Sequence, residues 1–351
     1  MRKKVLEIFG DTSHKKQAMM FTVILGKVCT LLCLSFWTGD YHVMIRSQSK
    51  ILDNFPFITS RLIGPLETSD PILVHYVKKT FLVSPSNLPY NLVEEREGQD
   101  PTAHKYLKYK CCSWTFQKLV LKQLFDGKPP GFFVEAGALD GEYLSNTLYL
   151  ERALGWTGLL VEPSKDMFTL LSHKGRKAWT AHVCLATHPY PYQTTLLKVS
   201  KVGAGMNFHG ISTLIGTKDV DHRMESGLPV FEPVQCLPLM TLLLAVGVTK
   251  VDFISLDVED AEGGVLEHFP WDEIEVDLWI IEHRGSNEHW DQATVFDKDF
   301  VERFASRGYS LFHFHWTGDY VFIRNATELY KSGFTELGKS KFNVTMKGLN
   351  Y

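Results

Sequence analysis

Cysteine, net charge and long apolar stretches are all scarce in this chain, and each shortage excludes a class of protein. The 351 residues include 6 cysteines and no CxxC pair, which argues against a structural zinc site. Basic residues (37) nearly balance acidic ones (40), and no basic stretch is long enough to bind a nucleic acid. Hydrophobic residues (44%) and charged residues (22%) are at ordinary levels, which excludes a disordered, collagen-like or multi-span membrane protein.

One apolar stretch, residues 18–37, is long enough to cross a membrane. As a helix it spans about 30 Å, the thickness of the hydrocarbon layer. Lys27 lies near its middle and makes insertion marginal, because a central lysine costs about 2.5–3.5 kcal/mol. Basic residues cluster before the stretch and, by the positive-inside rule, hold residues 1–17 in the cytosol. The sequence therefore predicts a single-pass type II membrane protein whose later residues lie in the lumen or outside the cell.

Other interpretations of this stretch stay open. A cleaved signal peptide would use residues 28–37 as its apolar region, although no small-residue cleavage site follows. A soluble protein would bury the stretch as an N-terminal helix. The string Trp37-Thr-Gly-Asp-Tyr41 also recurs at 316–320, as expected of a duplicated fragment or of an N-terminus foreign to the natural chain.

Two further features agree with export. Asn325 and Asn343 each begin an Asn-x-Thr triplet, the acceptor of N-linked glycans. Four cysteines follow the apolar stretch, and we expect Cys184 and Cys236 to form a disulfide, with buried free thiols as the alternative.

Composition divides the rest of the chain. Residues 38–110 mix proline, serine, asparagine and charge, and are predicted to form a stem with a short helix that Asp70 caps and Pro71 begins. Residues 111–326 are predicted to form the folded domain, and 327–351 a C-terminal tail.

Within the predicted domain, short apolar runs alternate with helical stretches. The runs occupy residues 131–136, 158–161, 179–185, 251–256, 276–282 and 309–313. Such runs are typical of a parallel sheet covered on both faces. A turn at 317–319 adds a C-terminal antiparallel hairpin, so we expect an α/β fold with a doubly wound, mostly parallel sheet.

Glycines and acids follow the first of these strands. Glu135 lies near the end of this strand, and the loop after it contains Gly137, Asp140 and Gly141. Glycine lets the backbone approach a ligand closely, and the helix that follows offers free N–H groups. This loop predicts one wall of a ligand pocket.

Two later strands also end in acids. Glu162 ends the second strand, where a carboxylate can accept both hydroxyls of a ribose. Asp257 and Glu259 end a third strand, so we expect three acidic strand ends to converge on a nucleoside-sized pocket. In the alternative interpretation these acids only cap helices. We predict no metal site, because the helix dipole stabilises acidic side chains at a helix start and so accounts for these acids without a metal ion.

Several motifs resemble the FkbM-type family of S-adenosylmethionine-dependent methyltransferases. They lie at 132–142, 145–147, 155–158, 162–163 and 251–266. The resemblance implies a Rossmann-like class I methyltransferase fold with S-adenosylmethionine as cofactor. It places the 135–141 loop along the methionine and adenosine, Glu162 on the ribose, and Asp257 with Glu259 at the methyl group or an acceptor hydroxyl.

The chain is more similar still to a membrane-anchored branch, the Star-like proteins of insects, over roughly residues 70–324. Further motifs at 89–92, 176–179, 184–185, 189–191, 235–238 and 270–272 carry this likeness. It implies a lumenal domain in the endoplasmic reticulum, Golgi, endosome or plasma membrane that handles protein cargo. Such cargo includes growth-factor precursors, the ligands of the epidermal growth factor receptor.

The alternative function is an active O-methyltransferase that modifies a sugar or lipid hydroxyl. Two departures from the family pattern bear on it: Ser255 stands where the family often has lysine, and Asp260 where it usually has glycine. A crowded acidic cluster raises pKa values and repels anions. These departures favour cofactor binding over catalysis.

Overall fold

The computed structural model describes residues 66–92, 115–200, 212–217, 228–284, 295–315 and 317–337. All of them belong to one compact unit, Thr59–Tyr351. The predicted tail 1–17, the predicted membrane segment 18–37 and Asn343 lie outside the described residues. Among the residues that are described, no helix is long and apolar enough to cross a membrane.

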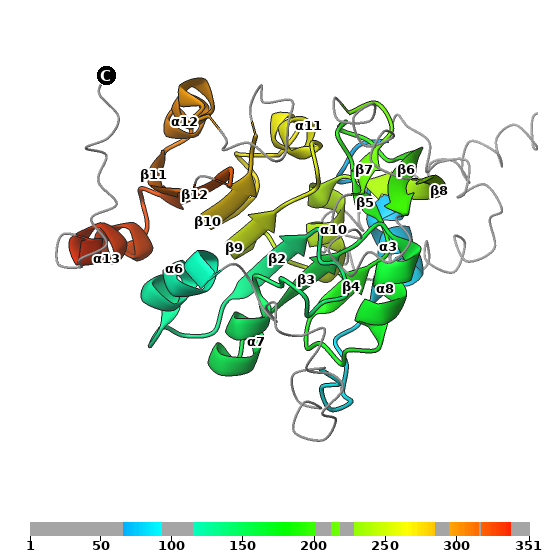
Figure 1. The fold of residues 1–351 in the computed structure, drawn as a ribbon, viewed down its shortest axis with the longest axis horizontal. Helices are drawn as coiled ribbons and strands as arrows, with labels where there is room; N and C mark the ends of the chain where they lie inside the picture. The colour runs from blue at the N-terminus through cyan, green and yellow to red at the C-terminus, as the bar shows by residue number, and fades with distance from the viewer. Residues whose placement is uncertain are drawn as a thin grey trace, which may run out of the picture. The chain divides into compact units, whose positions relative to one another are not determined.

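Eight strands form the main sheet, in the order β1-β4-β3-β2-β9-β10-β12-β11 (Figure 1). Their bounds are β1 (Leu82–Val83), β2 (Phe132–Ala136), β3 (Thr157–Val161), β4 (Trp179–Ala181), β9 (Lys250–Leu256), β10 (Glu275–Glu282), β11 (Tyr309–Phe314) and β12 (Asp319–Arg324). Five neighbouring strands run parallel: β4, β3, β2, β9 and β10. Strands β1, β12 and β11 pair antiparallel with their neighbours. The predicted mixed α/β fold and its C-terminal hairpin are confirmed.

The strand order reverses between β2 and β9. From β2 the chain moves outward to β3 and β4, and it then returns to place β9 on the other side of β2. Open α/β sheets bind their ligands at such a reversal, outside the carboxyl ends of the strands. The topology therefore predicts a ligand site at the carboxyl ends of β2, β3 and β9.

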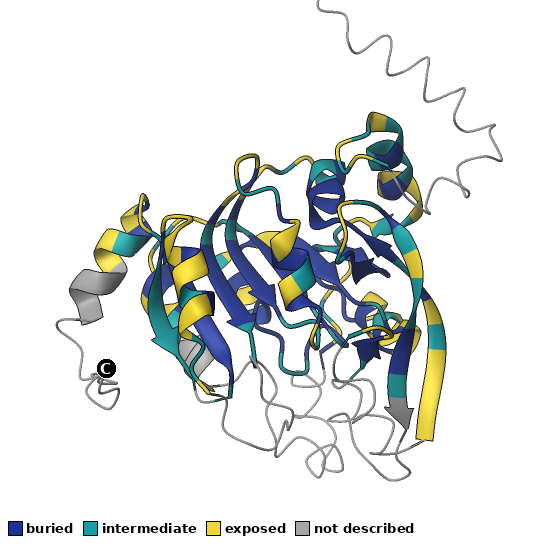
Figure 2. Cartoon of the chain, turned by 90° about the horizontal axis from the view of Figure 1, so that it is seen from above, coloured by how far each residue is buried: buried dark blue, intermediate teal, exposed yellow. Residues whose placement is uncertain are grey.

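Helices cover both faces of the main sheet. They are α3 (Pro71–Thr80), α6 (Thr115–Phe125), α7 (Leu148–Leu154), α8 (Lys165–Ser172), α10 (Leu239–Val246), α11 (Glu262–Glu267), α12 (Lys298–Ala305) and α13 (Glu328–Leu337). Figure 1 shows α6 and α7 on one side of the sheet, and α11 and α12 on the other. Neighbouring residues of one strand enter opposite cores, since Phe133 packs with one helical layer and Val134 with the other. The central strands are therefore buried on both faces (Figure 2).

A second, smaller sheet is inserted between β4 and α10. It consists of β5 (Cys184–Leu185), β6 (Tyr192–Ser200), β7 (Thr213–Leu214) and β8 (Leu228–Leu237), in the order β5-β8-β6-β7. The prediction of one strand over 179–185 is therefore wrong, because these residues form two strands, β4 and β5, in different sheets. The chain leaves the main sheet after Ala181, at His182, whose Nε2 lies 3.1 Å from the Pro163 carbonyl oxygen. Cys184 then pairs with Cys236 of β8 in the second sheet.

The packed domain extends beyond the predicted limits of 111–326 at both ends. Helix α3, expected in the stem, is capped by the Asp70 carboxylate and buries Leu73 and Val77 in the core against α10. At the other end, α13 follows residue 326 and buries Leu329 beside the opposite face of the sheet. The sequence did not show these ends because their packing partners are distant along the chain.

The segment after α3 also contacts the domain. Backbone N–H groups of Ser86 and Asn91 donate to the carbonyl oxygens of Arg176 and Lys174. Gly175 lies between these two acceptor residues with φ +69°, and a Cβ there would collide with the Pro89 carbonyl oxygen. Glycine is therefore required where the two segments meet.

Gly175→Ala is expected to lower the free energy of unfolding by about 1–3 kcal/mol more than Gly247→Ala does. Both glycines have a positive φ, so both substitutions add about 1–2 kcal/mol of backbone strain. Only the first adds a collision, since nothing lies within 4 Å of a Cβ at Gly247. Denaturant unfolding of the full chain measures both values. Equal losses would show that 86–91 does not pack against 174–176.

Candidate functional site

A pocket lies at the carboxyl ends of β2, β3 and β9, where the strand order reverses. It is lined by Gly137, Leu139, Val161, Glu162, Pro163, Val183, Cys184, Leu185, Leu196, Ser212, Leu214, Asp257, Val258, Glu259 and Ala261. The space between these walls, including the part open to solvent, is about 610 Å³. The main sheet supplies the acidic wall, and the second sheet supplies an apolar wall.

Gly137 lets the end of β2 approach the end of β9. Its φ is +84°, and a Cβ there would collide with the Asp257 carbonyl oxygen. On the other side, the N–H groups of Gly137 and Ala138 donate to the Val161 carbonyl at the end of β3. The loop is therefore held between two strand ends, which brings their acidic side chains to one place.

Glu162 follows β3 and is almost fully buried, with 3% of its surface exposed. One carboxyl oxygen accepts the Leu139 N–H and the other accepts the Ser164 N–H, each at 2.8 Å. Burial raises the pKa of Glu162 to about 8, against the effect of these two hydrogen bonds. Each oxygen keeps a further lone pair, so the carboxyl can accept donors from a ligand in the pocket.

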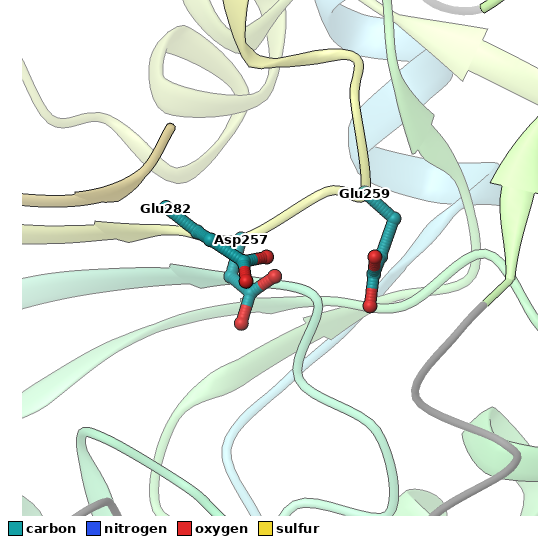
Figure 3. A group of neighbouring side chains, drawn as sticks. All are labelled: Asp257, Glu259 and Glu282. Atoms are coloured by element: carbon teal, nitrogen blue, oxygen red, sulfur yellow. The ribbon is translucent and has the colours of Figure 1, made fainter. Parts of the chain in front are cut away.

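Three carboxylates gather beside the pocket. Oxygen atoms of Asp257, Glu259 and Glu282 all lie within 4.8 Å of one another. Figure 3 shows Asp257 and Glu282 projecting together from neighbouring strand ends, with Glu259 on the loop beyond. Burial raises the pKa of Asp257 well above its usual range, and the negative charges of Glu282 and Glu259 add to this effect. Arg284 forms an ion pair with Glu282.

This trio has the all-oxygen donor set that Mg²⁺ and Ca²⁺ prefer. Glu282 was not among the acids that the sequence analysis grouped together. Glu282 lies beside Asp257 because β10 pairs in parallel with β9, with Ile281 opposite Leu256. The residues that follow this pair, Glu282 and Asp257, are both acids. Their proximity can be predicted only when the register of the two strands is known.

The chain matches a known family of protein domains. The methyltransferase FkbM domain matches residues 135–311, just over half of the chain. The chain belongs to this family. The family generally uses S-adenosylmethionine. No curated protein matches the sequence.

Four residues expected at the site line the pocket of this FkbM domain: Gly137, Glu162, Asp257 and Glu259. The other three, Glu135, Asp140 and Gly141, lie outside its walls. Sequence reasoning missed the apolar wall, because it comes from β5, β6 and β7, whose pairings are distant in sequence.

Glu135 is committed to the loop that follows β2. Its carboxylate accepts the Ser145 and Thr147 hydroxyls, at 2.9 and 2.5 Å, and the Asn146 N–H at 2.6 Å. Burial raises the pKa of Glu135, and the nearby positive charge of Arg176 opposes that rise. In this geometry Glu135 holds the loop in place rather than contacting a ligand.

Asp140 and Gly141 also serve the loop. The Asp140 carboxylate accepts the N–H groups of Glu142 and Tyr143 and lies 3.0 Å from the Lys174 ammonium. A Cβ on Gly141 would collide with Leu171 of α8. These contacts fix the conformation of the loop on the side away from the pocket walls.

Arg176 ties the loop to α7. It is 2% exposed, forms an ion pair with Glu151 at 3.0 Å, and donates to the Gly141 carbonyl. It also donates to the Thr147 hydroxyl at 3.0 Å. Segment 176–179 thus carries a residue that stabilises the loop after β2.

A disulfide joins Cys184, in the apolar wall, to Cys236. Both cysteines are buried, and Cys184 itself lines the pocket. The bond fixes the short strand β5, which has only two paired residues, to the longer β8. The shape of this wall therefore depends on an oxidised cysteine pair.

The free energy of unfolding is expected to fall as pH rises from about 5 to 8. Burial raises the pKa of Glu262 to about 8 in the folded domain, so the unfolded chain releases this proton at lower pH than the folded one. Glu262→Gln should make the decline shallower, by up to about 1.4 kcal/mol per pH unit. Denaturant unfolding at several pH values measures the slope.

Glu267→Gln is the matched control, because Glu267 is exposed at the other end of the same helix. It should leave the slope unchanged. A Glu262→Gln slope equal to that of the wild type would show that Glu262 ionises alike in both states.

Proposed function

We propose that this FkbM domain binds S-adenosylmethionine in the pocket and methylates a hydroxyl of a sugar or lipid. The observation that carries the proposal is Glu162: a buried carboxyl, held by two backbone amides, on the wall of a pocket at the strand reversal. A carboxyl at that position suits the two hydroxyls of a ribose.

The rest of the pocket fits the same ligand. Val183, Leu185 and Leu196 offer an apolar wall for a flat purine ring. Asp257 and Glu259 offer negative charge to a ligand with an ammonium and a sulfonium group. When bound, S-adenosylmethionine supplies a methyl group on positively charged sulfur.

Asp257 is our candidate for the group that takes the proton from an acceptor hydroxyl. Its pKa lies well above the usual range of an aspartate, because of burial and of the charges of Glu282 and Glu259. With its pKa raised, this carboxylate binds a proton more readily than an exposed aspartate does. Arg284, paired with Glu282, balances part of the negative charge around it.

Glu162→Gln is expected to weaken S-adenosylmethionine binding about 5- to 150-fold, because an amide NH₂ group would then face a backbone N–H. Ser212→Trp should weaken binding as well, by filling the pocket from the second sheet. Glu267→Gln, far from the walls, should bind like the wild type. Calorimetric titration of the full chain measures all four. No binding by the wild type at millimolar cofactor would overturn the proposal.

A second proposed function is the handling of protein cargo, as in the Star-like proteins. In this proposal residues 1–17 are cytosolic, residues 18–37 lie in the bilayer, and the domain faces the lumen of the secretory pathway or the cell exterior. The Cys184–Cys236 disulfide supports a lumenal domain, because such bonds persist in oxidising compartments. The partners would then be membrane lipid and a cargo such as a growth-factor precursor.

Export of a growth-factor precursor from cells that lack the chain separates the two functions. If cargo handling is the function, the precursor is retained, and both wild type and Asp257→Asn restore its export. Rescue by wild type alone would show that methyl transfer is required. Normal export without the chain would exclude the cargo role.

A further inference from the structure

We propose that Asn325 carries an N-linked glycan, at the end of the main sheet opposite the pocket. Asn325, Ala326 and Thr327 form the turn between β12 and α13, and Asn325 is exposed there. An acceptor asparagine must be reachable at the surface, and in the folded domain this one is.

The turn is well defined by its hydrogen bonds. The Asn325 N–H donates to the Gly308 carbonyl, and its side-chain oxygen accepts the Ser310 hydroxyl at 2.7 Å. The Thr327 hydroxyl donates to the Arg324 carbonyl and accepts the Tyr330 N–H, which caps α13. The triplet therefore has a structural role of its own, and each test substitution must preserve it.

Strand β10 shows where the glycan would lie. At its start, Glu275 and Asp277 pair with Arg324, the residue before Asn325, at 3.0 and 2.9 Å. At its end, Glu282 joins the acids beside the pocket. The strand between Glu275 and Glu282 spans roughly 23 Å. A glycan on Asn325 would therefore leave the pocket free.

The glycan would also lie beside an outer strand of the main sheet, as far as the described residues show. β11 is the outermost strand of the main sheet, and Ser310, near its start, contacts Asn325. Exposed edges pair readily with other chains unless they are covered. A sugar chain at this turn would cover the start of that edge.

The reaction requires a lipid-pyrophosphate-linked oligosaccharide, which is present in the lumen of the endoplasmic reticulum. The Asn325 amide nitrogen forms a bond to the first sugar, the bond from that sugar to the pyrophosphate oxygen breaks, and the amide proton is lost to the transferase. The buried Cys184–Cys236 disulfide points independently to an oxidising compartment.

The experiment expresses the full chain in animal cells and treats it with an amidase that removes N-linked glycans. We expect the wild type to shift to higher mobility. Asn325→Asp should lose one glycan while keeping an oxygen for the Ser310 hydroxyl. Thr327→Ser should keep the glycan, because serine preserves both the triplet and the hydroxyl cap.

Asn343→Gln separates the second triplet and should retain the Asn325 glycan. Release in water carrying a heavy oxygen isotope, followed by peptide mass spectrometry, should mark position 325 as a labelled aspartate. No mobility shift in the wild type, or no label at 325, would overturn the proposal. Thermal unfolding of Asn325→Asp and Thr327→Ser should match the wild type, which excludes misfolding as the cause of a lost glycan.

Discussion

The close approach of Gly137 to the Asp257 carbonyl is the contact on which the site depends. With a side chain at 137, the ends of β2 and β9 would move apart. Because they meet, the loop beyond Gly137 can place the Leu139 N–H on Glu162 at the end of β3. Three strand ends that are far apart in sequence then share one pocket, and the strand reversal provides the opening between them.

Buried carboxylates in this domain differ in their partners, and the partners distinguish their roles. Glu151 has Arg176, and Glu135 has three donors from one turn, so both are balanced within the fold. Asp257 instead lies among other acids, and burial together with their negative charges raises its pKa. An acid left without such compensation costs stability, and that cost is expected where a site must bind or react.

Much of the main sheet could be predicted, because its strands are buried on both faces and appear as short apolar runs. Glu162 and Asp257 were predictable as strand-end acids for the same reason. The second sheet was not, since β6 pairs with β8 across a long separation and β5 has only two paired residues. The role of Glu135 was hidden because its partners, Ser145 and Thr147, lie ten or more residues downstream. Glu282 needed the register of β10 against β9.

The order of the pocket walls along the chain has a consequence for biogenesis. A nascent chain exposes β2, β3 and β4 well before Asp257 and Glu259 leave the ribosome. Cys184 and Cys236 are separated by 52 residues, so their disulfide can form only after β8 has been made. A ligand that needs all of these walls can therefore bind only after Glu259 has been made.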